Sequence, residues 1–220
     1  MNLRCLISSV ALSLACLVPC RSDGAIMVSN LDDNVAVFFS VGANDYWAGS
    51  RFITDGSSPG FTLQSITVGL ANAEGGGGFF VAIFSDAGGQ PGIALETLSG
   101  SEDPLSEGDY EYASSGISLA PNSSYWVVAG IQETGGTFNW KAGGSQFSFT
   151  GPWTIPSNDT YITSFPEGGS TWNTSFNNDG FPFLFSVSAV AVPEPSTTAF
   201  LSGGISVLMI VLKHRFRRRK

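Results

Sequence analysis

The feature that most constrains the fold of this chain is the alternation of short apolar runs with turn-forming clusters between residues 35 and 190. The runs are rich in β-branched and aromatic residues, they show no helical period, and clusters of Gly, Asn, Asp, Ser and Pro separate them. This pattern is typical of strands joined by turns, and it predicts an all-β fold of the β-sandwich type, jelly-roll-like in its strand spacing. The predicted strands are residues 35–41, 47–54, 61–70, 78–85, 93–98, 110–119, 124–131, 137–142, 146–150, 160–165 and 183–190.

Two of these runs carry apolar residues on both alternating faces, at residues 79–84 and 125–129. Such strands suit the middle of a sandwich whose outer face is covered by a loop or a neighbouring element. A third run, residues 61–70, changes its apolar phase between Leu63 and Ile66. That change predicts a β-bulge near Gln64 and Ser65.

The first residues have the composition of an export signal. Arg4 precedes an apolar run at residues 5–18, which a polar exit follows. A short run of this kind is typical of a secretory signal peptide, which we assign to residues 1–25. A cut after Ser22 would place small residues at the cleavage site, and a cut after Ala25 is the alternative.

Cysteine and histidine are confined to the two ends of the chain. The three cysteines are Cys5, Cys16 and Cys20, and the single histidine is His214. The predicted body, residues 26–190, therefore has no disulfide, thiolate metal site, Ser-His or Cys-His nucleophile, or histidine-bound metal. On these grounds we expect the protein not to be an enzyme.

The charges of the body are almost all negative. Between residues 26 and 192 the only cations are Arg51 and Lys141, against sixteen of the 18 acidic residues of the chain. An acidic surface disfavours nucleic acid and anionic polymers as partners. We expect both cations to be paired with nearby carboxylates.

The C-terminal segment, residues 191–220, has three parts in a fixed order. Val192-Pro193-Glu194-Pro195 comes first, followed by an apolar stretch at residues 197–212. As a helix this stretch would be about 24 Å long, which predicts a short transmembrane helix. The basic tail, residues 213–220, would stay on the cytoplasmic side and leave the body outside.

This order of parts resembles a PEP-CTERM sorting signal, whose sorting motif would be Val192, Pro193, Glu194 and Pro195. The resemblance implies a bacterial protein that the helix holds briefly in the inner membrane until an exosortase-type enzyme processes the tail. It also implies a final location at the cell surface or in an extracellular matrix that contains exopolysaccharide. A plain membrane anchor is the alternative reading of the same segment.

Part of the body resembles the choice-of-anchor R domain of bacterial surface proteins. The matching segments are residues 61–68, 81–92, 95–100 and 119–128. The resemblance implies a β-sandwich with no established enzymatic activity, and it assigns no binding residues. We therefore expect a structural protein of the cell surface or matrix.

Tryptophan offers an alternative function. Trp47, Trp140, Trp153 and Trp172 are predicted near strand ends or loops, where exposed indoles could stack on sugar rings. In a carbohydrate-binding module of the extracellular matrix, Trp140 and Trp172 would be the candidate stacking residues. Packing of these rings over the open ends of the sandwich is the competing interpretation.

Carboxylates leave two further hypotheses open. A glycoside hydrolase would need a carboxylate pair, and the acidic residues between 102 and 111 are the candidates, although Pro104, Ser106 and Gly108 mark that segment as a solvated loop. No cofactor is expected. A structural calcium ion could take oxygen ligands from acidic loops. The candidate residues in these two hypotheses are Glu102, Asp103, Glu107, Asp109, Glu111, Asp32, Asp33, Asp55 and Asp86.

Overall fold

The computed structural model describes residues 24–41, 46–73, 77–131, 136–144, 147–157, 160–164, 172 and 181–193, with the backbone alone at residues 37 and 160–164. The signal peptide up to residue 23, Glu194 and Pro195, the predicted transmembrane helix and the basic tail lie outside these residues.

The described residues form strands and no helix, which confirms the predicted all-β fold. The strands are β1 (Ala25–Ser29), β2 (Val37–Val41), β3 (Tyr46–Ile53), β4 (Phe61–Ala73), β5 (Phe79–Asp86), β6 (Pro91–Thr97), β7 (Gly108–Ala113), β8 (Ser118–Leu119), β9 (Ser124–Ile131), β10 (Phe138–Ala142), β11 (Thr160–Ser164) and β12 (Phe185–Ala191).

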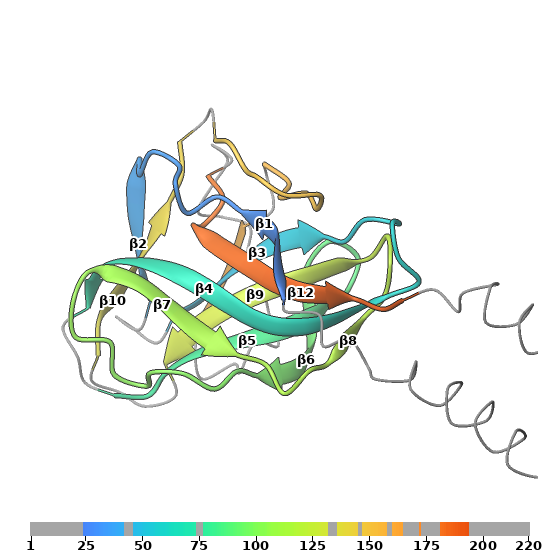
Figure 1. Cartoon of the computed structure of the whole chain (residues 1–220). Helices are drawn as coiled ribbons and strands as arrows, with labels where there is room; N and C mark the ends of the chain where they lie inside the picture. Colours follow the sequence, from blue (N-terminus) through green and yellow to red (C-terminus); the bar gives the residue numbers. More distant parts are fainter. Residues whose placement is uncertain are drawn as a thin grey trace, which may run out of the picture.

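Two antiparallel sheets pack face to face. The first, sheet A, has the order β1-β12-β4-β10-β2, and β7 and β8 also pair with β4. The second, sheet B, has the order β11-β3-β9-β5-β6. Figure 1 shows β1, β12, β4 and β7 side by side in one layer, with β9, β5 and β6 in the other. The jelly-roll connectivity stays a prediction.

The core between the sheets is dominated by aromatic rings from distant parts of the chain. The Phe52 and Trp153 rings stack in parallel with centroids 5.6 Å apart, and Phe61 meets the same indole edge-on at 4.9 Å. Phe185 of β12 closes the group from sheet A, 6.4 Å from Phe52. Each such pair stabilises the fold by about 0.5–1.5 kcal/mol beyond the area it buries.

The predicted bulge in β4 is confirmed. The register between β12 and β4 shifts between Ser188, which pairs with Ser65, and Ala189, which pairs with Leu63, so Gln64 is the extra residue. Leu63 before the bulge and Ile66 after it are both fully buried in the main core. The bulge thus allows one long strand to keep its apolar residues on a single face.

The predicted cover over the outer face of sheet B is also confirmed. Phe80 and Phe84 of β5 and Trp126 of β9 form a second apolar cluster, separate from the main core. Trp172 belongs to this cluster, and its ring meets Phe84 edge-on at 6.2 Å. The two strands are therefore apolar on both faces because both faces are packed.

Three strand predictions were wrong. Residues 110–119 are two strands, β7 and β8, because the chain turns between them at Gly116, whose φ is +97°. Residues 147–149 form no strand, and Thr150 makes only an isolated bridge to Ser29. Strand β1 was missed, since the first predicted strand began at residue 35.

At one corner of the sandwich the chain crosses directly from sheet B to sheet A. Leu98 donates a backbone hydrogen bond to Val81 of β5, and the next residue, Ser99, exchanges two with Ala113 of β7. Glu96 adds a side-chain link, since its carboxylate accepts a bond of 2.6 Å from the Ser114 hydroxyl.

This link makes stability depend on pH. Burial raises the pKa of Glu96, but hydrogen bonds from Ser114 and Ser115 lower it more, so the net pKa lies below its ordinary value of 4.5. A lowered pKa contributes stability that is present above 4.5 and is lost as the pH falls through the folded-state value. We expect Glu96→Gln to flatten the loss of unfolding free energy between about pH 6 and about pH 3. Urea titrations of both proteins would measure it, and identical pH profiles would contradict the assignment.

Close packing at the same corner predicts a steric effect. A Cβ on Gly100 would overlap the Tyr112 ring, whereas one on Gly108 would have its nearest neighbour, also a tyrosine ring atom, at 3.8 Å. We expect Gly100→Ala to lower the free energy of unfolding by about 1–3 kcal/mol. The matched control, Gly108→Ala, should stay within about 0.5 kcal/mol of the parent protein in urea unfolding. Equal effects of the two substitutions would disprove this account of the corner.

Candidate functional site

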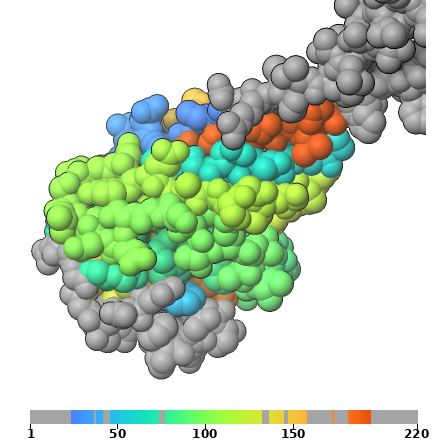
Figure 2. Space-filling model, turned by 60° about the horizontal axis from the view of Figure 1, so that its bottom comes forward, coloured from blue at the N-terminus to red at the C-terminus, as the bar shows by residue number. Residues whose placement is uncertain are grey.

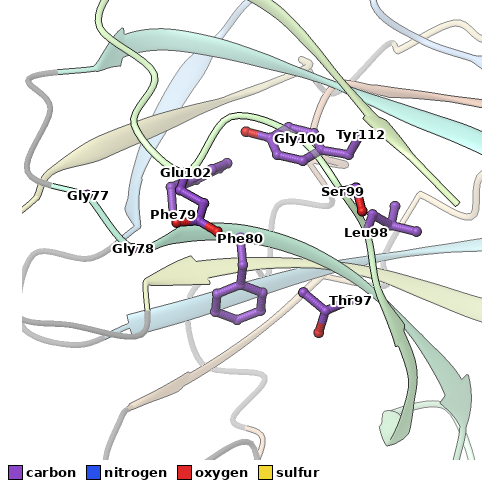
Figure 3. Close-up of a pocket in the computed structure, with 10 residues that line it drawn as sticks. All are labelled: Gly77, Gly78, Phe79, Phe80, Thr97, Leu98, Ser99, Gly100, Glu102 and Tyr112. Atoms are coloured by element: carbon purple, nitrogen blue, oxygen red, sulfur yellow. The ribbon is translucent and has the colours of Figure 1, made fainter.

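A cavity lies at the corner where the chain crosses between the sheets. It measures about 580 Å³ and is lined by the start of β5, by residues 97–102 and by Tyr112 of β7. Figure 3 shows the Tyr112 ring above β5 and the Phe80 and Thr97 side chains below it. A glycine pair, Gly77 and Gly78, forms one end, and both have positive φ, which favours glycine.

The Tyr112 side chain at this corner cavity is engaged within the fold. The Tyr112 hydroxyl donates a hydrogen bond of 2.8 Å to the Ser101 carbonyl. Burial, and secondarily the nearby Tyr110, raise the pKa of Tyr112 far above its ordinary value, so the phenol stays protonated and does not act as a base. Glu102 is the only carboxylate among the lining residues. Among the residues that the structure describes, the lining therefore offers no carboxylate pair of the kind that glycoside hydrolysis requires.

The candidate carboxylates of the acidic segment are spread over several elements. Glu107 forms an ion pair with Lys141, with 2.8 Å between Oε1 and Nζ. Asp103 accepts a bond of 3.3 Å from the backbone N–H of Gly77. Asp109 and Glu111 lie on β7, so the segment is only partly the predicted loop.

Asp86 organises the outer face of sheet B. Its Oδ1 accepts a hydrogen bond of 2.8 Å from the Trp126 indole, and its Oδ2 accepts one of 3.0 Å from the backbone of Gly89. Arg51 lies 3.9 Å from the same carboxylate, and its guanidinium sits 5.8 Å from the centre of the Trp126 ring. Both predicted ion pairs of the body cations, at Arg51 and Lys141, are thus confirmed.

The calcium hypothesis gains no geometric support from the described residues. Within that part of the chain, no group of three or more Asp, Glu, His or Cys side chains is placed to hold a metal ion. Asp86 is engaged as described above, and Asp55 accepts a bond of 2.8 Å from the Ser57 hydroxyl in its own turn. A structural calcium ion stays a prediction.

The hypothesis of exposed tryptophans needs correction. Trp140 has 0% of its surface exposed, its ring stacks on Phe183 at 4.5 Å, and its indole N–H donates a bond of 2.9 Å to the Leu184 carbonyl. Trp172 is 7% exposed, within the outer cluster of sheet B. Both rings are enclosed by neighbouring side chains, so neither offers a free face to a sugar.

The predicted sorting motif begins where the hydrogen bonding of the body ends. The Val192 N–H donates a bond of 2.9 Å to the Gly60 carbonyl, and the Val192 carbonyl accepts one of 2.8 Å from the Ser58 hydroxyl. Pro193 follows as an exposed residue. At the other end of the body, Ala25 pairs with Ala189 near the end of β12, so both ends of the body leave from the same end of sheet A.

The class of protein that these observations define is an antiparallel two-sheet sandwich with a closed aromatic core. Comparisons with protein-family models and with curated protein sequences give no match to this chain. Among the residues described, no helix is long and apolar enough to cross a membrane.

The network around Asp86 predicts a large effect of its loss. Asp86→Ala removes the acceptor of a buried indole N–H together with the cap of the following turn, which should lower the free energy of unfolding by about 2–3 kcal/mol. The control is Asp55→Ala, which removes a carboxylate that bonds only within its own turn and should cost less than about 1 kcal/mol. Urea unfolding followed by tryptophan fluorescence would compare them, and a smaller loss at Asp86 than at Asp55 would overturn the assignment.

Proposed function

We propose that this chain is an exported bacterial protein with a structural role at the cell surface or in an exopolysaccharide-containing matrix, without catalytic activity. An exosortase-type enzyme processes its tail after the helix at residues 197–212 has held it in the inner membrane. The observation that carries the proposal is the order of the tail: Val192-Pro193-Glu194-Pro195, the apolar stretch, and six cations among the last eight residues.

The geometry around Val192 supports a tail that is separate from the body. The buried Ser58 and the backbone of Gly60 fix Val192 at the surface of the sandwich, and the prolines after it cannot donate hydrogen bonds to extend a sheet. The prolines on both sides of Glu194 disfavour a helix there, so we expect a processing enzyme to meet the motif as an extended segment.

The common exit of the two ends supports the same arrangement. Because β1 and the end of β12 are neighbours in sheet A, a leader before Ala25 and a tail after Val192 join the body at one place (Figure 1). A body attached to the membrane there would leave its remaining surface available to the outside. The structural role rests on the sequence of the body, which lacks Cys and His from residue 26 to residue 192.

Changing the motif tests the sorting proposal. We expect the triple variant Pro193→Ala, Glu194→Gln, Pro195→Ala to accumulate as a precursor in the membrane fraction, because the processing enzyme no longer recognises the tail. Intact mass measurement of the protein from the cells that produce it would show a C-terminus at Lys220 for the variant and a shorter one for the parent.

The matched control is Glu102→Gln, which removes one exposed carboxylate elsewhere and should leave processing unchanged. A parent protein that itself retains Lys220 in its own cells would refute the sorting proposal. Normal processing of the triple variant would refute the role of the motif.

A further inference from the structure

A shallow groove of about 380 Å³ lies on the outer face of sheet A. Strands β1, β12, β4 and β7 cross it side by side; Figure 2 shows β7 in green next to β4 in teal, with β12 in orange beyond. Half of the lining residues carry hydroxyl groups, namely Ser29, Ser65, Thr67, Ser186 and Ser188.

The strand register arranges these hydroxyls in two rows. In the first row Ser29 pairs with Ser186, Ser186 with Thr67, and Thr67 with Glu111 across all four strands. In the second, Ile26 pairs with Ser188 and Ser188 with Ser65. Neighbouring strands lie about 4.8 Å apart, so the first row, across four strands, spans about 14 Å and the second, across three strands, spans about 10 Å. Those lengths suit an extended ligand with many polar groups rather than a single ion.

Two of the side chains are almost enclosed, while their hydroxyl oxygens still reach the open space of the groove. Ser65 is 8% exposed and Ser186 is 7% exposed, and both line the groove. Within the described part of the chain, neither hydroxyl has a hydrogen-bond partner. The two hydroxyls therefore keep their hydrogen-bonding capacity on the side that faces the groove, where a ligand can use it.

The carboxylates at the rim limit which chemical groups such a ligand can carry. Asp32, Asp109 and Glu111 also line the groove, and they form no ion pair among the described residues. Three carboxylates repel an acidic ligand and accept hydrogen bonds from hydroxyl or ammonium groups. Since they are not placed to hold a metal ion together, a bare divalent cation does not fit.

We propose that this groove binds a segment of glycan chain that carries hydroxyl or amino groups and no acidic groups. The two hydroxyl rows exchange hydrogen bonds with successive sugars, the carboxylates accept from the sugar hydroxyl or ammonium groups, and Ile26, which is mostly exposed at the edge, contacts a sugar C–H face. This proposal names a partner and a surface that the sorting proposal does not require.

Affinity electrophoresis of the full chain in a zwitterionic detergent tests the proposal, since a sugar-based detergent would compete. The gels contain hydroxyethylcellulose as the neutral probe, chitosan as the amino probe, or alginate as the acidic probe. We expect slower migration with hydroxyethylcellulose or chitosan, no retardation with alginate, and no effect of EDTA.

The variants separate binding from folding. Ser65→Ala and Ser186→Ala remove hydroxyls that have no partner in the fold, so the unfolding midpoint should be unchanged or higher while affinity falls about threefold to tenfold for each. Thr67→Val removes a groove hydroxyl at constant shape and should weaken binding by a similar factor. Thr62→Val makes the same change on the same strand outside the groove and should bind as the parent does.

Four results would overturn the proposal: no retardation by hydroxyethylcellulose or chitosan, retardation by alginate alone, binding that EDTA abolishes, or equal binding by the parent and the three groove variants. None of these results depends on how the tail is processed. A normal terminal mass together with no glycan binding would therefore refute the groove and leave the sorting proposal standing.

Discussion

The pairing of β4 with four other strands is the interaction on which the rest of the molecule depends. This 13-residue strand takes β12 and β10 along one side and β7 and β8 along the other, so it connects almost every element of sheet A. The extra residue at Gln64 shifts the register where β12 pairs with β4, and a bulge of this kind bends its strand and increases the local twist. The same bulge places Ile66 and Val68 in the core and turns Ser65 and Thr67 outward. The bulge thus decides which residues of β4 enter the core and which of them line the groove.

A body without disulfides has to obtain its stability from packing, and here the aromatic rings supply much of it. Trp153 stacks on Phe52 and Trp140 on Phe183, so two of the largest side chains serve to join elements that are far apart in sequence. This use of tryptophan has a functional consequence. Rings that are enclosed on their faces are not available for recognition, and polar groups on the outer strands are left to make contacts with the surroundings.

Much of the fold could be predicted from the sequence because individual strands show a clear alternation of apolar and polar residues. In Phe185-Ser186-Val187-Ser188-Ala189 the apolar residues are buried and the serines face outward, as alternation requires. The burial of Trp140 could not be predicted, because it depends on Phe183, which the topology brings across from another segment. The groove could not be predicted either. Each of its serines looks like an ordinary outward position, and only the register places Ser29, Ser186 and Thr67 in one row.

The hydroxyl rows and the two ends of the body lie on the same sheet. Ala25 and Val192 leave from one end of sheet A, while the hydroxyl rows occupy the outer face of the same sheet. Strands β1 and β12 belong to both features, since each contributes some residues to the exit and other residues to the groove. Sheet B carries a different outer face, covered by Phe84, Trp126 and Trp172 and closed by the Asp86 network. The two outer faces therefore differ in kind: sheet B is sealed by apolar packing, and sheet A presents polar groups whose hydrogen bonds the fold itself does not use.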